Sequence, residues 1–414
     1  MTSVIRESAT PESSTLNQIF DQITEGFDQI AKGAAQRERD RVLPHEQIGW
    51  LRDAGIGRLR LPAKDGGAGA SLPELFGLVI DLAAADSNVA HILRSHFGFV
   101  EEQLHNPDRT ASRRWLSLVA DGNLFGNAVS EQNDIAVGRK AGTTQLNTVL
   151  TPDGSGGFRL DGVKFYSTGT LFSTWVNVQA VDQEGATYSV IVPVDRAGVT
   201  VVDDWDGFGQ RLTGTGTTRF DDVAVRADET QRGHARDVEA SPTYFGAFYQ
   251  LYLQALTAGV LAAIQSDAVA LTRRRERNFS HASQPLPSDD PQVLQVVGEI
   301  AADAFAARAI VLTAAQTLQA ASDSEVDGEF DPDAARAASL AAAQAKIAVD
   351  RFSYAAAARL LDVGGASATQ LRYGHDRHWR NIRTVSTHNP TFLKATAVGS
   401  LLVNGSPLPQ NGYF

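Results

Sequence analysis

The apolar residues of this chain change their spacing twice, and this change limits the possible folds more than any single motif. Near the start they recur at helical spacing, at Leu16, Ile19, Phe20, Ile23, Phe27 and Ile30. Between about residues 122 and 228, short runs alternate apolar and polar residues and are separated by turn residues. Helical spacing returns from about residue 241. Because helices and strands have different side-chain periods, the chain predicts an α+β fold with a β domain between two helical parts.

The pattern gives approximate domain boundaries. We expect a disordered polar terminus over 1–14, an N-terminal helical domain over 15–121, a compact antiparallel β domain over 122–236, and a C-terminal helical bundle and tail over 237–414. The strands expected in the β domain include 158–165, 174–181, 188–194 and 217–225. Four long helices are expected in the bundle, at 243–279, 290–322, 332–363 and 388–403.

Composition excludes several classes of function. The net charge of the 414-residue chain is −11, which disfavours nucleic acid and anionic membranes as partners because both require a positive face. The chain has no cysteine, so disulfides, thiolate catalysis and cysteine-ligated metals are excluded. We find no leader peptide and expect no uncharged apolar run of the ~18 residues that a membrane span needs, so we predict a cytoplasmic protein without a membrane partner.

Two segments rich in glycine or arginine suggest phosphate binding, and each has a simpler alternative. The run Gly66–Ser71 lacks both the lysine of a phosphate loop and a flanking strand–helix–strand unit, so we interpret it as a turn. Arg273, Arg274, Arg275 and Arg277 end a long predicted helix. They can form a solvated face that complements the helix dipole, or they can bind a phosphate, and the sequence leaves both alternatives open.

The segment 372–390 combines four arginines, three histidines and one tryptophan in an otherwise acidic chain. Such a segment suits an anionic cofactor together with a group that handles protons. His375 and His378 have a spacing that could bind a metal, but the surrounding arginines would repel a cation, so we predict no metal site. His388 in this segment and His96 after an apolar helix are each either functional or structural on sequence grounds.

Several local sequences resemble the acyl-CoA dehydrogenase fold: 51–56 with 61–67, 126–131 and 161–169. Three further stretches, 203–216, 372–383 and 388–394, together with 404–409, resemble one branch of that fold. This branch is the two-component flavin monooxygenases typified by dibenzothiophene monooxygenase, with related alkanesulfinate monooxygenases and amine N-hydroxylases. The resemblance implies an N-terminal helical domain, a central antiparallel β-barrel and a C-terminal four-helix bundle.

The missing catalytic base separates the two activities found on this fold. An acyl-CoA dehydrogenase needs a carboxylate to remove a carbon-bound proton. The chain has His388-Asn389-Pro390 at one family position for this acid, and no Asp or Glu between Glu239 and Asp267 at the other. The resemblance therefore implies oxygenation through a flavin C4a-hydroperoxide, with sulfur favoured over nitrogen as the reacting atom. FAD-dependent acyl-CoA dehydrogenation is the alternative, and a catalytically silent flavin-binding protein is a third possibility.

The resemblance also assigns residues and partners. It gives His96 and His388 the supply of protons and orientation of the hydroperoxide, and Thr168 a hydrogen bond to the flavin or the peroxide. The other implied cofactor contacts are Asn127, Trp205, Thr215, Arg277, Ser367, Asn389 and Lys394. It implies FMN rather than FAD, reduced by a separate NAD(P)H:flavin reductase, and a homotetramer in which Arg277 binds the phosphate held by a neighbouring subunit. Arg94 and Ser95 before His96 favour a small polar substrate over a fused aromatic one.

Overall fold

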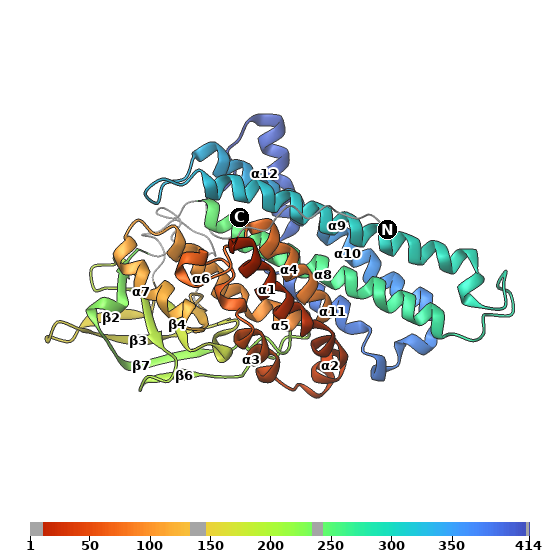
Figure 1. Ribbon diagram of the computed structural model, residues 1–414, viewed down its shortest axis with the longest axis horizontal. Helices are drawn as coiled ribbons and strands as arrows, with labels where there is room; N and C mark the ends of the chain where they lie inside the picture. Colours follow the sequence, from red (N-terminus) through yellow and green to blue (C-terminus); the bar gives the residue numbers. More distant parts are fainter. Residues whose placement is uncertain (1–10, 133–145, 234–242, 411–413) are drawn as a thin grey trace.

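The middle of the chain forms a sheet that lies at one side of the molecule, and the helices from the two ends of the chain lie together on the other side (Figure 1). The computed structural model describes residues 11–132, 146–233, 243–410 and 414. The N-terminal helices are α1 (Pro11–Glu25), α2 (Phe27–Asp40), α3 (His45–Asp53), α4 (Leu72–Ala85), α5 (Ser87–Ile92), α6 (Arg94–Leu104) and α7 (Arg109–Ala120). The C-terminal helices are α8 (Thr243–Arg274), α9 (Pro291–Asp323), α10 (Pro332–Gly364), α11 (Asp376–Ser386) and α12 (Thr391–Asn404).

The described N-terminus is more helical than expected. Helix α1 begins at Pro11, inside the segment 1–14 that was predicted to be disordered. Ile19, Ile23 and Ile30 are buried in the main core, as their helical spacing predicts. The domain boundary expected between residues 236 and 237 lies outside the described residues, and the other boundaries stay predictions.

The central sheet is mixed, which corrects the expectation of a purely antiparallel domain. Within the described residues its eight strands are β1 (Phe125–Ala128), β2 (Val149–Pro152), β3 (Phe158–Lys164), β4 (Trp175–Val181), β5 (Thr187–Pro193), β6 (Val199–Val201), β7 (Thr218–Val225) and β8 (Thr230–Arg232). Seven follow the order β6-β7-β3-β2-β4-β5-β8, and β1 pairs with β4. Both β1 and β2 run parallel to β4, while the remaining pairs are antiparallel. Parallel pairing joins segments that are distant in sequence, so local alternation does not reveal it.

One face of the sheet forms its own small core. Leu150, Leu160, Val178, Val190 and Val223 are fully buried there. Buried and exposed residues alternate over much of β7, which is the period-two pattern seen in the sequence, whereas the central residues of β4 and β5 are buried on both faces. The register slips between Leu160 and Gly162 opposite β7, which is the effect of a β-bulge.

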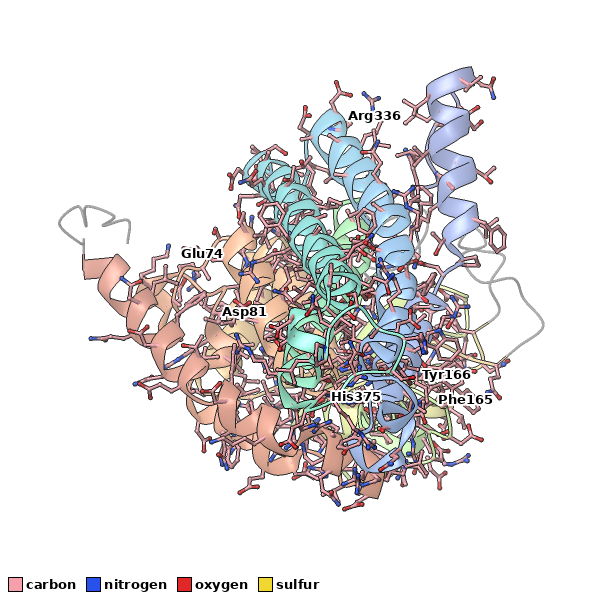
Figure 2. All side chains as sticks on the ribbon, turned by 90° about the vertical axis from the view of Figure 1, so that its right-hand side faces the viewer. Glu74, Asp81, Phe165, Tyr166, Arg336 and His375 are labelled. Atoms are coloured by element: carbon pink, nitrogen blue, oxygen red, sulfur yellow. The ribbon has the colours of Figure 1, made fainter. Side chains whose placement is uncertain are left out.

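Three long helices, α8, α9 and α10, pack against one another, and the fourth partner is α4 from the N-terminal part. Helix α12, expected in the bundle, packs against α10 and stands beside its outer end in both figures, where Arg336 on α10 is labelled in Figure 2. A four-helix bundle of C-terminal helices alone is therefore not confirmed. Helix amphipathicity shows that a face is buried but does not identify the helix that buries it.

Helix α8 corrects the expectation about apolar runs. No charged residue occurs between Glu239 and Asp267, and α8 is long and apolar enough by length and composition to cross a membrane. Most of this stretch is buried within the protein, against α4, α9 and α10. A core helix enclosed by other helices has the same composition as a membrane span. The cytoplasmic location stays a prediction.

Candidate active site

Helix α6 lies between the sheet and the long helices, because it packs against both β1 and α8. His96 on this helix is buried, and both of its ring nitrogens bind backbone groups. Its Nε2 lies 2.8 Å from the carbonyl oxygen of Gly57, and its Nδ1 accepts a hydrogen bond from the backbone N–H of Phe125 at 3.2 Å. His96 is therefore neutral with the proton on Nε2, and burial lowers its pKa to about 4.

This geometry gives His96 a structural position instead of the expected place beside a reacting group. The imidazole joins the turn at Gly57 to the first residue of β1, two positions before Asn127. A proton donor needs a free N–H directed at the substrate or cofactor, and the N–H of His96 is bound to protein. The structure thus favours the core alternative that the sequence had left open for this residue.

Ser95, the neighbour of His96, connects two of the predicted flavin contacts. Its buried hydroxyl lies 2.7 Å from Asn127 Oδ1 and 2.9 Å from the carbonyl oxygen of Thr168. Thr170 donates a hydrogen bond to the backbone oxygen of Asn127 at 2.9 Å. Helix α6, strand β1 and the segment after β3 therefore meet at one polar patch, formed by Ser95, Asn127 and Thr168.

A row of three threonine hydroxyls extends from this patch. Thr168 Oγ1 lies 2.8 Å from Thr215 Oγ1, which lies 2.6 Å from Thr213 Oγ1. Thr213 then donates a hydrogen bond to the carbonyl oxygen of Gln210 at 2.9 Å. Thr168 and Thr215 are half-buried, whereas Thr213 is fully buried behind them. The two predicted threonine contacts thus lie together, at the accessible end of a buried row.

A small polar cavity opens beside Asn127 and contains a carboxylate that the sequence analysis missed. Its lining residues are Ser95, Phe99, Glu102, Gly126, Asn127, Val129, Asn177 and Tyr249. Glu102 is buried, and it accepts hydrogen bonds from the hydroxyl of Tyr249 at 2.8 Å and from Asn177 Nδ2 at 3.5 Å. Glu102 lies on α6, six positions after His96. The sequence therefore already showed a carboxylate near this histidine.

The segment 386–391, which carries His388, connects α11 to α12. His388 is exposed, while the next residue, Asn389, is buried and donates a hydrogen bond to Gln250 of α8 at 2.5 Å. Lys394 in the first turn of α12 is also buried, with its ammonium 4.0 Å from the centre of the Phe414 ring. Burial, with a smaller contribution from the charge of Lys346, lowers the pKa of Lys394 to about 7.

The remaining predicted contacts lie at other parts of the surface. Arg277, just beyond α8, and Ser367, in the turn Ala366–Thr369, are both exposed. Trp205 is half-buried, and its indole N–H donates to the carbonyl of Gly209 at 3.2 Å. Its ring contacts the exposed Tyr166, labelled in Figure 2, with centroids 6.2 Å apart. Within the described residues of one chain, Arg277 and Ser367 have no contact with the patch at Thr168.

Most of the basic segment 372–390 is occupied with internal ion pairs. Arg380 Nη1 lies 2.8 Å from Glu38, and Arg377 Nη2 lies 3.3 Å from Asp267. Arg383 donates to the hydroxyl of Tyr354 at 2.7 Å. These contacts attach α11 to α2, α8 and α10. The expected anionic cofactor therefore competes with protein partners for these three arginines.

Asp267, His375 and His378 form a cluster whose possible ligand atoms lie within 4.8 Å of one another. His378 Nε2 is 2.8 Å from Asp267 Oδ2, and Arg377 approaches the same oxygen. Burial alone would raise the pKa of Asp267, but the nearby imidazoles of His375 and His378 and the charge of Arg377 lower it below its usual range. A cation here would face the Arg377 guanidinium, so we interpret the cluster as an ion-pair network joining α8 to α11.

Comparison with known proteins connects this geometry to a group of flavin enzymes. The family model described as acyl-CoA dehydrogenase, C-terminal domain, matches residues 252–391. Dibenzothiophene monooxygenase of Mycolicibacterium goodii is 31% identical over 399 residues, covering 92% of this chain and 90% of that protein. A probable FMNH2-dependent monooxygenase, SfnC, of Pseudomonas putida is 28% identical over 398 residues, covering 92% and 94%. The crystal structure of FMN-bound TdsC from Paenibacillus sp. A11-2 matches with a TM-score of 0.87 and 28% identity, covering 96% of this chain and 100% of that one.

Proposed function

Because the chain belongs to the family of dibenzothiophene monooxygenases, flavin enzymes with an acyl-CoA dehydrogenase-like fold, we propose that it oxygenates a small polar sulfur compound at the patch of Ser95, Asn127 and Thr168. The chain is an FMNH2-dependent monooxygenase, and FMN is its cofactor. Both predictions made from the sequence are confirmed. The substrate, the residue roles and the assembly below are our proposals.

The polar patch carries this proposal, because it brings predicted flavin contacts from three separate segments together. Thr168 and Thr215 are accessible and supported by buried groups, so they fit a polar edge of FMN. Bound FMN in its reduced form supplies two electrons to O2, so that one oxygen atom reaches the substrate and the other leaves as water. Asn127 and Thr168 hold the flavin, Trp205 covers it, and Asn389 and Lys394 support it from the connection after α11 and from α12.

His388 is the residue to which we assign proton supply. It is exposed on a segment that Asn389 anchors to α8, so its side chain can reach a ligand while its backbone is held. His96 has a different role, since its ring fixes the start of β1 and thereby the position of Asn127. Hydroxyl, amide and imidazole groups orient a substrate and exclude water without removing a carbon-bound proton.

The cavity beside Asn127 has space for about one water molecule, so it supports a small polar group of the substrate and no larger part of it. Glu102, Asn177 and Tyr249 place hydrogen-bonding groups on its wall, and Tyr249 packs against the guanidinium of Arg94. Fused aromatic compounds bind best to apolar walls, because burying a polar wall against them leaves hydrogen-bonding groups without partners. Substrates with a polar group near the reacting sulfur therefore fit this wall better than dibenzothiophene.

Assembly and supply of reduced flavin complete the proposal. We assign the reduction of FMN to a separate NAD(P)H:flavin reductase that releases it to this enzyme. Arg277 and Ser367 are exposed and separate from the Thr168 patch within one chain, which supports contacts with an FMN held by a neighbouring subunit in a homotetramer. Guanidinium groups bind phosphate with two parallel hydrogen bonds, so Arg277 suits that contact.

The test mixes the purified protein with photoreduced FMN, labelled oxygen and a substrate panel of thioethers, sulfones, sulfinates and amines. We expect labelled product with polar thioethers or sulfinates, whose sulfur has a lone pair that can accept the oxygen atom. His388→Ala should reduce product at least about a hundredfold while flavin is still oxidised and hydrogen peroxide is released, in the range of a lost general acid. Thr387→Ala, an exposed neighbour, serves as the matched control. Product formation unchanged by His388→Ala would contradict the assigned role.

Glu102 supplies a specific reason to test the dehydrogenase alternative. It is the carboxylate among the described residues lining the cavity, and such a group is what proton removal from carbon requires. An acyl-CoA should bleach bound oxidised flavin only if the chain desaturates acyl groups, and Glu102→Gln should then abolish the bleaching. We expect no bleaching with either the wild type or the variant.

A further inference from the structure

We propose that the threonine row makes Thr168 a hydrogen-bond acceptor toward the flavin, so that the site prefers reduced FMN to oxidised FMN. The inference rests on the proposed contact between Thr168 and the cofactor, and it takes this contact to be at nitrogen N5 of the flavin ring. It adds Thr213 and Gln210 as positioning residues, which act through Thr215 and Thr168 without touching the flavin themselves. It also gives a function to the buried end of the row, Thr213 and Gln210.

The direction of the row follows from counting protons. A threonine hydroxyl has one proton to donate. Thr213 uses its proton on the carbonyl of Gln210, at 2.9 Å, because a carbonyl oxygen can only accept. The contact of 2.6 Å between Thr213 and Thr215 must then be donated by Thr215, and the contact of 2.8 Å between Thr215 and Thr168 by Thr168. All three protons point away from the accessible end, and the lone pairs of Thr168 point toward a ligand.

The anchor of the row is held rigidly. Gln210 has a φ of 52°, in the left-handed region that side chains other than glycine rarely adopt. Its backbone N–H donates to Asn381 of α11 at 2.6 Å, and its side-chain amide donates to Ser87 of α5 at 3.1 Å. His91 Nδ1 lies 3.0 Å from Gln210 Oε1. A strained backbone persists where its surroundings determine it, and here two helices fix the carbonyl that orients the row.

The chemistry of the isoalloxazine ring makes this direction matter. Reduction adds a hydrogen to nitrogen N5, which becomes a donor, whereas N5 of the oxidised ring presents only a lone pair. An oxygen that can only accept forms a hydrogen bond with the reduced ring and opposes the lone pair of the oxidised one. An unmatched polar contact costs about as much as a hydrogen bond contributes, on the order of 1 kcal/mol. The row therefore shifts the relative affinities of the two forms without changing the fold.

Thr213→Val tests the direction, because it removes the last hydroxyl and keeps the shape. The proton of Thr215 then loses its acceptor and can turn toward Thr168, which frees the proton of Thr168 to point outward. Anaerobic titration of wild type, Thr213→Val and Thr213→Ser with oxidised and photoreduced FMN gives a Kd for each form. We expect the wild type to bind reduced FMN more tightly, Thr213→Val to lower this preference about tenfold, and Thr213→Ser to retain it. An unchanged preference in correctly folded Thr213→Val overturns the proposal.

Thr168→Val provides a second test that does not disturb a buried position, since Thr168 is half-buried. We expect the Kd for reduced FMN to rise about tenfold and the Kd for oxidised FMN to fall, because the oxygen that opposes N5 of the oxidised ring has been removed. Equal weakening of both forms would overturn the directional row but leave Thr168 as a flavin contact. No change in either Kd would show that Thr168 does not contact the flavin, and would overturn this inference together with the site assignment.

Discussion

At the scale of single residues, the structure separates two histidines that the sequence treated alike. Both His96 and His388 were assigned to proton supply because of the family resemblance. His96 has its two nitrogens bound to the backbone of Gly57 and Phe125, while His388 is exposed on a connecting segment. Imidazole serves equally well as a buried connector and as an acid, so residue type alone does not decide between these roles.

Replacing His96 by glutamine distinguishes these roles. The glutamine amide has a donor and an acceptor, as neutral imidazole has, but it cannot release a proton at ordinary pH. We expect His96→Gln to keep most of the product formed per reduced flavin and to lose about 1–2 kcal/mol of stability, whereas His96→Ala should lose about 2–4 kcal/mol. Urea unfolding and product yield provide the two measurements. A well-folded His96→Gln that releases only hydrogen peroxide would restore the proton-supply role.

At the scale of elements, a buried ion pair on α10 holds the segment 386–391. Lys346 and Asp350 are one turn apart, with 2.9 Å between Nζ and Oδ2, and each has only 1% of its side chain exposed. Lys346 also donates to the carbonyl of Ser386 at 3.0 Å, and Asp350 accepts from the hydroxyl of Thr391. The pair thus contacts the segment on both sides of His388, and its geometry is set by α10.

Removing one partner of this pair should destabilise the protein more than removing both. Asp350→Ala leaves a buried ammonium and is expected to cost about 3–5 kcal/mol, whereas Lys346→Met with Asp350→Leu should cost much less. The double variant still loses its hold on the segment, so we expect product per reduced flavin to fall. That fall should disappear when His388→Ala is already present, since the pair acts through His388. Wild-type product yield in the double variant would contradict this role.

A second element contact involves a glycine that lets α6 approach α8. A Cβ on Gly98 would lie 2.2 Å from the ring of Tyr249, the residue whose hydroxyl binds Glu102. We expect Gly98→Ala to cost about 1–3 kcal/mol and to raise the KM for the substrate, because the tyrosine must move. Gly298→Ala on α9, where nothing lies within 4 Å of the new Cβ, should instead stabilise by about 0.5–1 kcal/mol. Thermal unfolding of both variants tests this prediction, and a similar loss of stability in the two would contradict it.

At the scale of the whole molecule, buried neutral histidines predict loss of stability in weak acid. Burial lowers the pKa of His91 to about 3 and the pKa values of His96 and His378 to about 4, from 6.5. The unfolded chain therefore binds more protons than the folded one between these values, and stability falls as the pH drops below about 6.5. Each histidine contributes on the order of 2 kcal/mol by pH 4.5.

The carboxylates change their charge in a lower pH range than the histidines, so the effects of the two groups on stability can be measured separately. Burial would raise the pKa of Glu101, but Arg60 and His105 lower it to about 2, so its contribution is lost only below its ordinary value of 4.5. We expect the free energy of unfolding, measured in urea, to decrease from pH 7 to pH 5. This free energy should change less steeply with pH in His96→Gln. A free energy of unfolding that is constant over this range would contradict the prediction.

Hydrophobic periodicity by itself determined the order of the elements in this protein. Helices, strands and helices follow one another as the spacing predicts, because each element buries one face and its period is local. The absence of an acid between Glu239 and Asp267, and at the position of His388, also pointed to oxygen chemistry before any contact was known.

Only the tertiary structure decided which elements meet. It placed α4 beside the long helices, made β1 and β2 parallel to β4, and brought Glu102 into the cavity with Asn127. It also showed which polar groups were already bound, as in His96 and in the threonine row that ends at Gln210. Pairing between distant segments and the direction of hydrogen bonds depend on three-dimensional neighbours, and a linear pattern carries no record of them.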